Sequence, residues 1–172
     1  PVDAIHFEER EAPVYDEAAV LRTKAEKEQR KTASLPCGCP GSEAKKIEGQ
    51  LSNWPVQIKL APVHAPYFEE ANLLVAADCT AYAYGDFHDE FIKNRVTLIG
   101  CPKLDAVDYA EKLTDILAEN KIQSVTVVRM QVPCCGGLEM AVKRAMEYSG
   151  KNLPWRIVTI SNDGKIVNEV RS

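Results

Sequence analysis

Apolar and polar residues follow two different periods from about residue 55 onward, and this pattern predicts alternating strands and helices. Residues 72–77, 96–100 and 124–130 are nearly continuous apolar runs, which are typical of strands buried on both faces of a parallel sheet. A similar run at 155–160 predicts a fourth such strand. The alternation of apolar residues over 56–63 predicts one more strand in front of them.

Helical periodicity occupies the stretches between the predicted strands. A helix is expected after Asp105, which is a plausible N-cap, and another over residues 136–149, which Gly150 would end in a left-handed conformation. Shorter helical segments are expected at 67–71 and 86–93. The first long helix places these apolar residues on one face: Tyr109, Ala110, Leu113, Ile116 and Leu117.

The end of the chain carries a hairpin signal. Asn162-Asp163-Gly164 predicts a tight turn that leads from the strand at 155–160 into a partner strand at 166–170. Strands that alternate with helices favour a parallel sheet covered on both faces. The sequence therefore predicts an α/β fold: an open, mostly parallel sheet in three layers, with a C-terminal β-hairpin.

The N-terminal residues have a different pattern. Residues 1–11 look extended, and residues 16–31 are rich in charge with only a thin apolar stripe, which predicts a surface helix or a linker. We therefore expect an N-terminal helical or extended appendage over residues 1–34 and an α/β domain over residues 35–172.

Composition narrows the class of protein. Apolar residues make up 45% of the chain, charged residues 27%, and the net charge is −4. A mildly acidic chain without a Lys/Arg cluster gives no electrostatic reason to expect nucleic acid or a membrane surface as a partner. No apolar run approaches the roughly 20 residues of a membrane-spanning helix. The nucleotide-binding patterns Gly-x-Gly-x-x-Gly and the P-loop are also missing.

Six cysteines carry the chemistry of this sequence, and nearly all of them stand beside Gly or Pro. Thiols that pack as small hydrophobic groups usually lie inside helices and strands. At turns, a sulfur atom can instead point toward a shared partner. The six lie in the segments Leu-Pro-Cys-Gly-Cys-Pro-Gly, Ala-Asp-Cys-Thr, Gly-Cys-Pro and Pro-Cys-Cys-Gly-Gly, and they are Cys37, Cys39, Cys79, Cys101, Cys134 and Cys135.

The predicted strands bring four of these thiols together. Cys79 and Cys101 each follow a strand, and Cys134-Cys135 follow a third. In a parallel sheet all the strand C-termini lie at one edge, where ligand sites gather. His64 ends the strand expected at 56–63 and should lie at the same edge. The loop with Cys37 and Cys39 precedes that strand and could fold over this edge as a lid.

The thiol pattern favours an iron–sulfur cluster over zinc. Structural zinc sites commonly use Cys-x₂₋₄-Cys pairs and need four ligands, whereas this chain has Cys-x-Cys, Cys-Cys and six thiols. Cluster ligation tolerates looser spacing, and free N–H groups near Gly and Pro can approach cluster sulfides. Disulfides are disfavoured because the chain has the core patterning of a larger domain and no export signal. We therefore expect a reduced, anaerobic cytoplasm.

The same segments, together with Ile-Gly-Cys-Pro-Lys-Leu-Asp, resemble the C-terminal domains of ferredoxin-linked iron–sulfur proteins from anaerobic bacteria. This resemblance covers residues 35–172 and implies cluster binding, electron transfer and a ferredoxin or ferredoxin domain as partner. The opening Pro-Val-Asp-Ala-Ile is similar to the segment after the last cluster cysteine of bacterial-type ferredoxins. It suggests an upstream ferredoxin module, although an arbitrary start explains it equally well.

Several alternatives stay open at this stage. The six cysteines allow one 4Fe-4S cube with two spare thiols, or a larger cluster that uses all six. The chain could also be an oxidoreductase that uses the cluster or the Cys134-Cys135 dithiol as its reaction site, or a zinc-stabilised interaction domain. His64 and His88 are candidates for donors around the cluster, although a lone histidine in a polar loop is more often simply solvated.

Overall fold

The structure is a computed structural model that describes residues 48–172. The chain divides into two units, Pro1–Lys45 and Lys46–Ser172, and all the described residues belong to the second. The appendage expected over residues 1–34, Cys37 and Cys39 therefore lie outside the described residues. Among the helices described, none is long and apolar enough to cross a membrane.

The predicted parallel sheet is confirmed, and it has five strands in the order β2-β1-β3-β4-β5. The first four are parallel, and β5 runs antiparallel to β4 as the predicted hairpin requires. The continuous apolar runs become the buried centre of the sheet, with Leu74, Val75 and Val128 fully buried. The strands are β1 (Asn72–Ala77), β2 (Val96–Gly100), β3 (Ser124–Met130), β4 (Trp155–Ile160) and β5 (Ile166–Arg171).

The chain adds strands first on one side of β1 and then on the other. The chain passes from β1 outward to β2, and then crosses to β3, which pairs with the other side of β1. In open α/β sheets, ligands bind at the carboxyl ends of the strands at such a switch point. The C-terminal ends of β1 and β3 therefore flank the position where this fold most readily holds a ligand.

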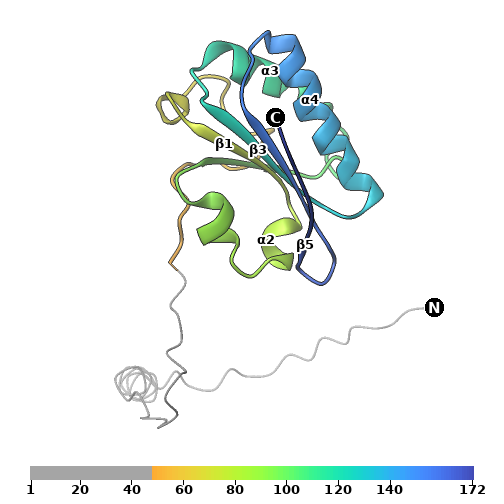
Figure 1. Cartoon of the computed structure of the whole chain (residues 1–172). Helices are drawn as coiled ribbons and strands as arrows, with labels where there is room; N and C mark the ends of the chain where they lie inside the picture. The colour runs from red at the N-terminus through yellow and green to blue at the C-terminus, as the bar shows by residue number, and fades with distance from the viewer. Residues whose placement is uncertain (1–47) are drawn as a thin grey trace, which may run out of the picture. The chain divides into compact units, whose positions relative to one another are not determined.

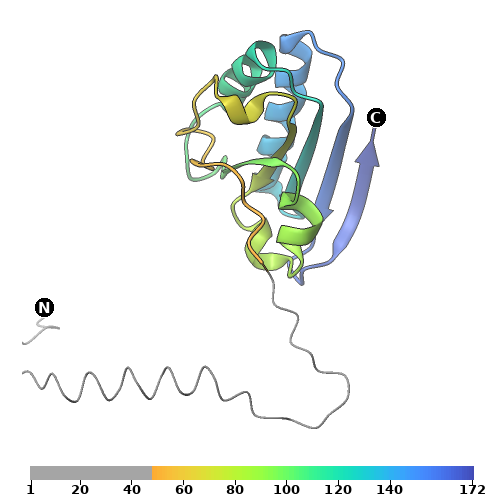
Figure 2. The same ribbon diagram turned by 90° about the vertical axis from the view of Figure 1, so that its left-hand side faces the viewer.

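The helices cover both faces of the sheet, as the three-layer prediction requires. Helices α3 (Tyr109–Glu119) and α4 (Gly136–Ser149) lie on one face, and α2 (Thr80–Ala83) and the π-helical turn η2 (His88–Ile92) lie on the other (Figures 1 and 2). Right-handed crossovers produce this arrangement, because the connections on the two sides of β1 run in opposite directions.

The ends of the two long helices follow from local hydrogen bonding. Gly150 has φ 67° and ends α4 as predicted. The predicted cap of α3 was wrong: its N-cap is Asp108, whose side chain accepts a hydrogen bond from the Ala110 N–H at 2.9 Å. Asp105 instead accepts a hydrogen bond from the Tyr109 hydroxyl, so its carboxylate is not available for capping.

The strand predicted over 56–63 does not form. Only Gln57 makes a parallel bridge, to Ile99 of β2. The chain then turns, because the N–H groups of Leu60 and Ala61 both donate to the Gln57 carbonyl at 2.9 Å. The helical segment expected at 67–71 is a single 3-10 turn, η1 (Pro66–Phe68).

Candidate cysteine site

The four described cysteines lie at the carboxyl edge of the parallel strands, where the sequence placed them. Cys79 follows β1, Cys101 follows β2 directly, and Cys134 and Cys135 follow β3. The segments of Cys79 and Cys101 are adjacent, because Ala77 pairs with Gly100 and the Asp78 N–H points to the Gly100 carbonyl at 3.4 Å. We call the region formed by these four residues the cysteine edge.

Cys135 has the most enclosed sulfur of the cysteine edge, with 5% of the residue exposed. Burial raises the pKa of its thiol, the Met130 backbone partly offsets this, and the neighbouring Cys134 and Cys79 thiols raise the pKa further. Cys79 and Cys134 are exposed, and Cys101 is half-buried. Cys135 is therefore close to two other thiols, on both sides of the switch point between β1 and β3.

The start of α4 forms one wall of the cysteine edge. The 3-10 turn η3 (Pro133–Cys135) runs directly into α4, so the first N–H groups of a 14-residue helix follow Cys135. A Cβ at Gly136 would meet no atom within 4 Å. Because nothing in the described protein fills that space, a sulfide or another anionic group could approach the helix N-terminus there.

Gly137 connects two of the cysteine-bearing segments. A Cβ at Gly137 would lie 3.2 Å from Cβ of Pro102, the residue after Cys101. The turn after β2 is therefore packed closely against the first turn of α4. This packing keeps Cys101 near the Cys134-Cys135 segment.

A polar cluster that sequence reasoning did not identify lies next to Cys79 and Cys101 and consists of Asp78, Asp105 and Tyr109. The Tyr109 hydroxyl donates to Asp105, and burial, followed by Asp105, raises the pKa of the Tyr109 phenol strongly. Burial and then Asp105 also raise the pKa of Asp78, whereas a hydrogen bond from Gln57 lowers it. The available signal was the spacing of Asp105 and Tyr109, which allowed a side-chain contact instead of a cap.

His64 is not brought to the cysteine edge. The placement expected for His64 was wrong, because the strand that would have carried it does not form. Its neighbour Val63 accepts a hydrogen bond from Asn120 at 2.8 Å, and Asn120 ends α3 and precedes β3, at the opposite edge of the sheet. His88 begins η2, and its Nδ1 accepts the Gln50 N–H at 3.0 Å, which occupies that nitrogen.

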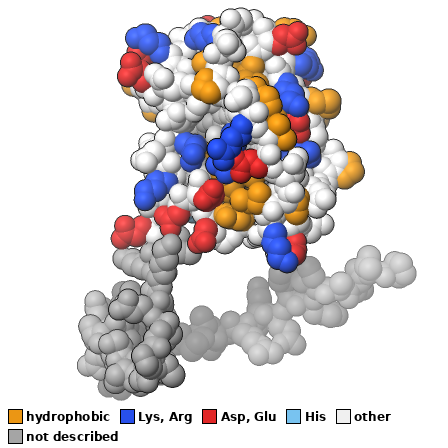
Figure 3. All heavy atoms as spheres, viewed as in Figure 1, with side chains coloured by type: hydrophobic (Ala, Val, Ile, Leu, Met, Phe, Trp, Pro, Cys, Tyr) orange, Lys and Arg blue, Asp and Glu red, His pale blue; other side chains and the backbone are white. Residues whose placement is uncertain are grey.

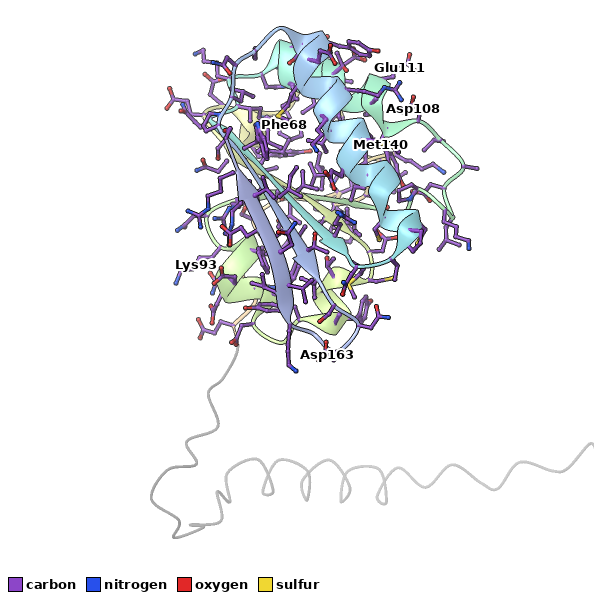
Figure 4. All side chains as sticks on the ribbon, turned by 45° about the vertical axis from the view of Figure 1, so that its right-hand side comes forward. Phe68, Lys93, Asp108, Glu111, Met140 and Asp163 are labelled. Atoms are coloured by element: carbon purple, nitrogen blue, oxygen red, sulfur yellow. The ribbon has the colours of Figure 1, made fainter. Side chains whose placement is uncertain are left out.

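A shallow groove lies beside the cysteine edge, between the turn after Cys101 and α4. It has a volume of about 350 Å³, and its lining includes Pro102, Val107 and Met140. Met140 on α4 and Asp108 at the start of α3 lie on the same side of the molecule (Figure 4). Leu104, in the same turn, is 79% exposed, and Met140 is 61% exposed. The surface next to the candidate ligands is therefore partly apolar.

Within residues 48–172, no three His, Cys, Asp or Glu side chains are arranged as a ready metal site. The donor set nevertheless fits a thiophilic centre, because Cys135 already lies close to the Cys134 and Cys79 thiols, and both of these are exposed. The open space at Gly136 lies on the same side.

The Rossmann-like domain family matches residues 65–172 of this chain. The chain belongs to that family. The matched residues include all five strands of this Rossmann-like domain and all four residues of the cysteine edge.

One relative is an uncharacterized protein of Archaeoglobus fulgidus. It is 36% identical over 103 residues, which are 59% of this chain and 72% of the relative. No solved structure matches the chain significantly. The comparisons therefore establish the fold family of the domain. Its chemistry has to be inferred from the residues at its carboxyl edge.

Proposed function

We propose that this Rossmann-like domain binds an iron–sulfur cluster at the cysteine edge and takes part in electron transfer. The observation that carries the proposal is the gathering of Cys79, Cys101, Cys134 and Cys135 at the ends of three neighbouring strands. When bound, such a cluster accepts and donates single electrons.

The donor chemistry supports iron–sulfur ligation over a structural zinc ion. Four thiols of the described residues lie at one edge of the sheet, and the chain holds six in all. The vicinal Cys134-Cys135 pair cannot act as the usual Cys-x₂₋₄-Cys zinc chelate. The N-terminus of α4, which begins directly after Cys135, and the open space at Gly136 suit a group that carries negatively charged sulfides.

Cys37 and Cys39 are proposed as the remaining ligands. A 4Fe-4S cluster would need four of the six cysteines, and a larger cluster could use all of them.

Electron transfer is favoured over a thiol-based reaction. A reactive cysteine needs a lowered pKa, whereas the pKa of the Cys135 thiol is raised by burial. The second candidate, a redox enzyme that uses Cys134-Cys135 as a dithiol, is therefore supported less well. We also propose a reducing cytoplasm as the compartment, because free thiols persist there.

A ferredoxin or ferredoxin domain is the proposed electron partner. The groove beside Cys101, whose lining includes the exposed Met140, and the exposed Leu104 in the turn after Cys101 offer apolar contact surface next to the ligands. Acidic and basic side chains are intermingled on the face of the domain shown in Figure 3. Apolar contact, rather than strong electrostatic steering, would therefore dominate docking.

Anaerobic reconstitution with iron and sulfide tests the proposal. We expect a brown protein with bound iron, acid-labile sulfide and an EPR signal after reduction. Separate Cys→Ser variants at all six positions should divide ligands from spare thiols, with His64→Ala as a matched control at the opposite edge. A colourless protein without iron after reconstitution would exclude cluster binding, and bound zinc alone would favour the interaction domain.

A further inference from the structure

We propose that Tyr109 positions Cys101 for ligand binding at the cysteine edge, an inference that rests on the proposed function. Tyr109 begins α3 and is 2% exposed. Its apolar ring belongs to the core, as the helical pattern predicts. Its hydroxyl, however, reaches the end of β2 next to Cys101.

The phenol lies directly against the backbone of Gly100. A Cβ at this position would lie 2.6 Å from Tyr109 Oη and 2.7 Å from its Cζ. Real Cβ atoms do not approach other atoms so closely, so only glycine admits the ring here. The hydroxyl is thereby held beside the peptide that joins Gly100 to Cys101.

Several hydrogen bonds connect the backbone of Cys101 to Tyr109 and Asp105. Its carbonyl accepts hydrogen bonds from the Leu104 N–H at 3.1 Å and from the Asp105 N–H at 3.0 Å. The Asp105 carboxylate in turn accepts a hydrogen bond from the Tyr109 hydroxyl. The Cys101 backbone also forms a hydrogen bond with the phenol oxygen. The Tyr109 side chain therefore completes this set of polar contacts.

This arrangement does more than satisfy a buried hydroxyl. Any carbonyl would serve that purpose, but the acceptor here belongs to the same turn as Cys101. Holding that turn fixes the direction in which the Cys101 side chain leaves the sheet. Such supporting groups typically change metal affinity about 10–100-fold when they are removed.

Three variants test this role in the reconstituted protein. Tyr109→Phe keeps the aromatic ring and removes Oη, whereas Asp105→Asn keeps an oxygen that can accept a hydrogen bond from the Tyr109 hydroxyl. Tyr148→Phe is the matched control, because Tyr148 is 65% exposed on α4. We expect Tyr109→Phe to lose about 10-fold in iron affinity and to shift the EPR signal. The Tyr148→Phe protein should remain close to wild type, and Asp105→Asn, which keeps an acceptor for the hydrogen bond from Tyr109, should lose less iron affinity than Tyr109→Phe.

A second readout needs no metal. In the metal-free protein, Tyr109→Phe should increase the rate at which iodoacetamide alkylates Cys101 relative to Cys134, as followed by mass spectrometry. Unchanged iron affinity, EPR signal and Cys101 alkylation in this variant would overturn the inference.

The two proposals fail separately. If the wild-type protein takes up no iron, the proposed function fails, and the alkylation rates alone decide the role of Tyr109. If Tyr109→Phe does not fold, Asp105→Ala takes its place, with the same expected loss of iron affinity and the same faster alkylation.

Discussion

Arg129 Nε lies 2.8 Å from Glu139 Oε2 and joins the end of β3 to the first turns of α4. The pair spans the turn that carries Cys134 and Cys135. Both side chains are largely buried, with 24% and 21% exposed, and Glu139 also pairs with Lys143 at 2.7 Å. The pair therefore links the sheet to α4 next to the cysteine edge.

Replacing Glu139 by Ala should destabilise the domain by about 1–2 kcal/mol, because the variant leaves the Arg129 guanidinium partly buried without its carboxylate. Urea unfolding of the metal-free protein measures this free energy. Glu147→Ala, an exposed glutamate on the same helix, is the control and should change stability by less than about 0.5 kcal/mol. Equal effects in the two variants would show that the Arg129 pair contributes little.

The same carboxylate should make stability depend on pH. A hydrogen bond from Lys143, with further contributions from Arg129, lowers the pKa of Glu139. Because the folded-state pKa is depressed, its contribution is complete above the unfolded-state value of about 4.3. It is lost as pH falls through the lower folded value. Unfolding free energies measured from pH 6 downward should therefore decline less steeply for Glu139→Gln than for wild type; parallel curves would contradict this.

The turn of the hairpin should not tolerate a side chain at Gly164. This residue has φ 77°, and a Cβ would lie 2.2 Å from the Ala83 carbonyl oxygen at the end of α2. Gly164→Ala should cost about 2–4 kcal/mol, since conformational strain and overpacking both contribute.

Gly150→Ala provides the comparison, because Gly150 has φ 67° but open space around its Cβ position. We expect it to cost only about 1 kcal/mol. Thermal unfolding of both variants separates the clash from the strain. Similar losses would mean that the hairpin and α2 move apart easily.

The cysteines should differ in reactivity when no metal is bound. Burial raises the pKa of the Cys135 thiol, so less of it is thiolate near pH 8 and its sulfur is also shielded. Iodoacetamide should therefore alkylate the exposed Cys79 and Cys134 before Cys135. Mass spectrometry of digested samples follows each site over time. A Cys135 that reacts first would favour the dithiol enzyme over electron transfer.

Gly136 should matter for the cluster more than for folding. A Cβ at Gly136 would meet no atom of residues 48–172 within 4 Å, and alanine is the better helix former by roughly 1 kcal/mol. Gly136→Ala should keep or increase stability in urea, yet bind less iron after reconstitution, because the methyl group enters the space beside Cys135. Gly85→Ala, also in open space, is the control. Full iron binding by Gly136→Ala would place the cluster elsewhere.

Local pattern predicted most of the sheet because buried parallel strands need unbroken apolar runs. It failed over 56–63, where alternating apolar residues suggested a strand. There the Gln57 carbonyl accepts two hydrogen bonds from its own segment, and only Gln57 bridges to β2. The position expected for His64 failed with that strand. Asp105 and Asp108 are equally good caps by composition, and the contact with Tyr109 decided between them.

The sequence by itself determined the parallel strands, the hairpin and the common edge of four cysteines. Each follows from periodicity and from the rule that parallel strands end together. Only the tertiary structure decided that Cys135 is buried beside Cys134 and Cys79, and that the Tyr109 phenol lies against the backbone of Gly100. Those relationships depend on how turns and α3 pack against the sheet, and contacts between residues distant along the chain leave no periodic trace in the sequence.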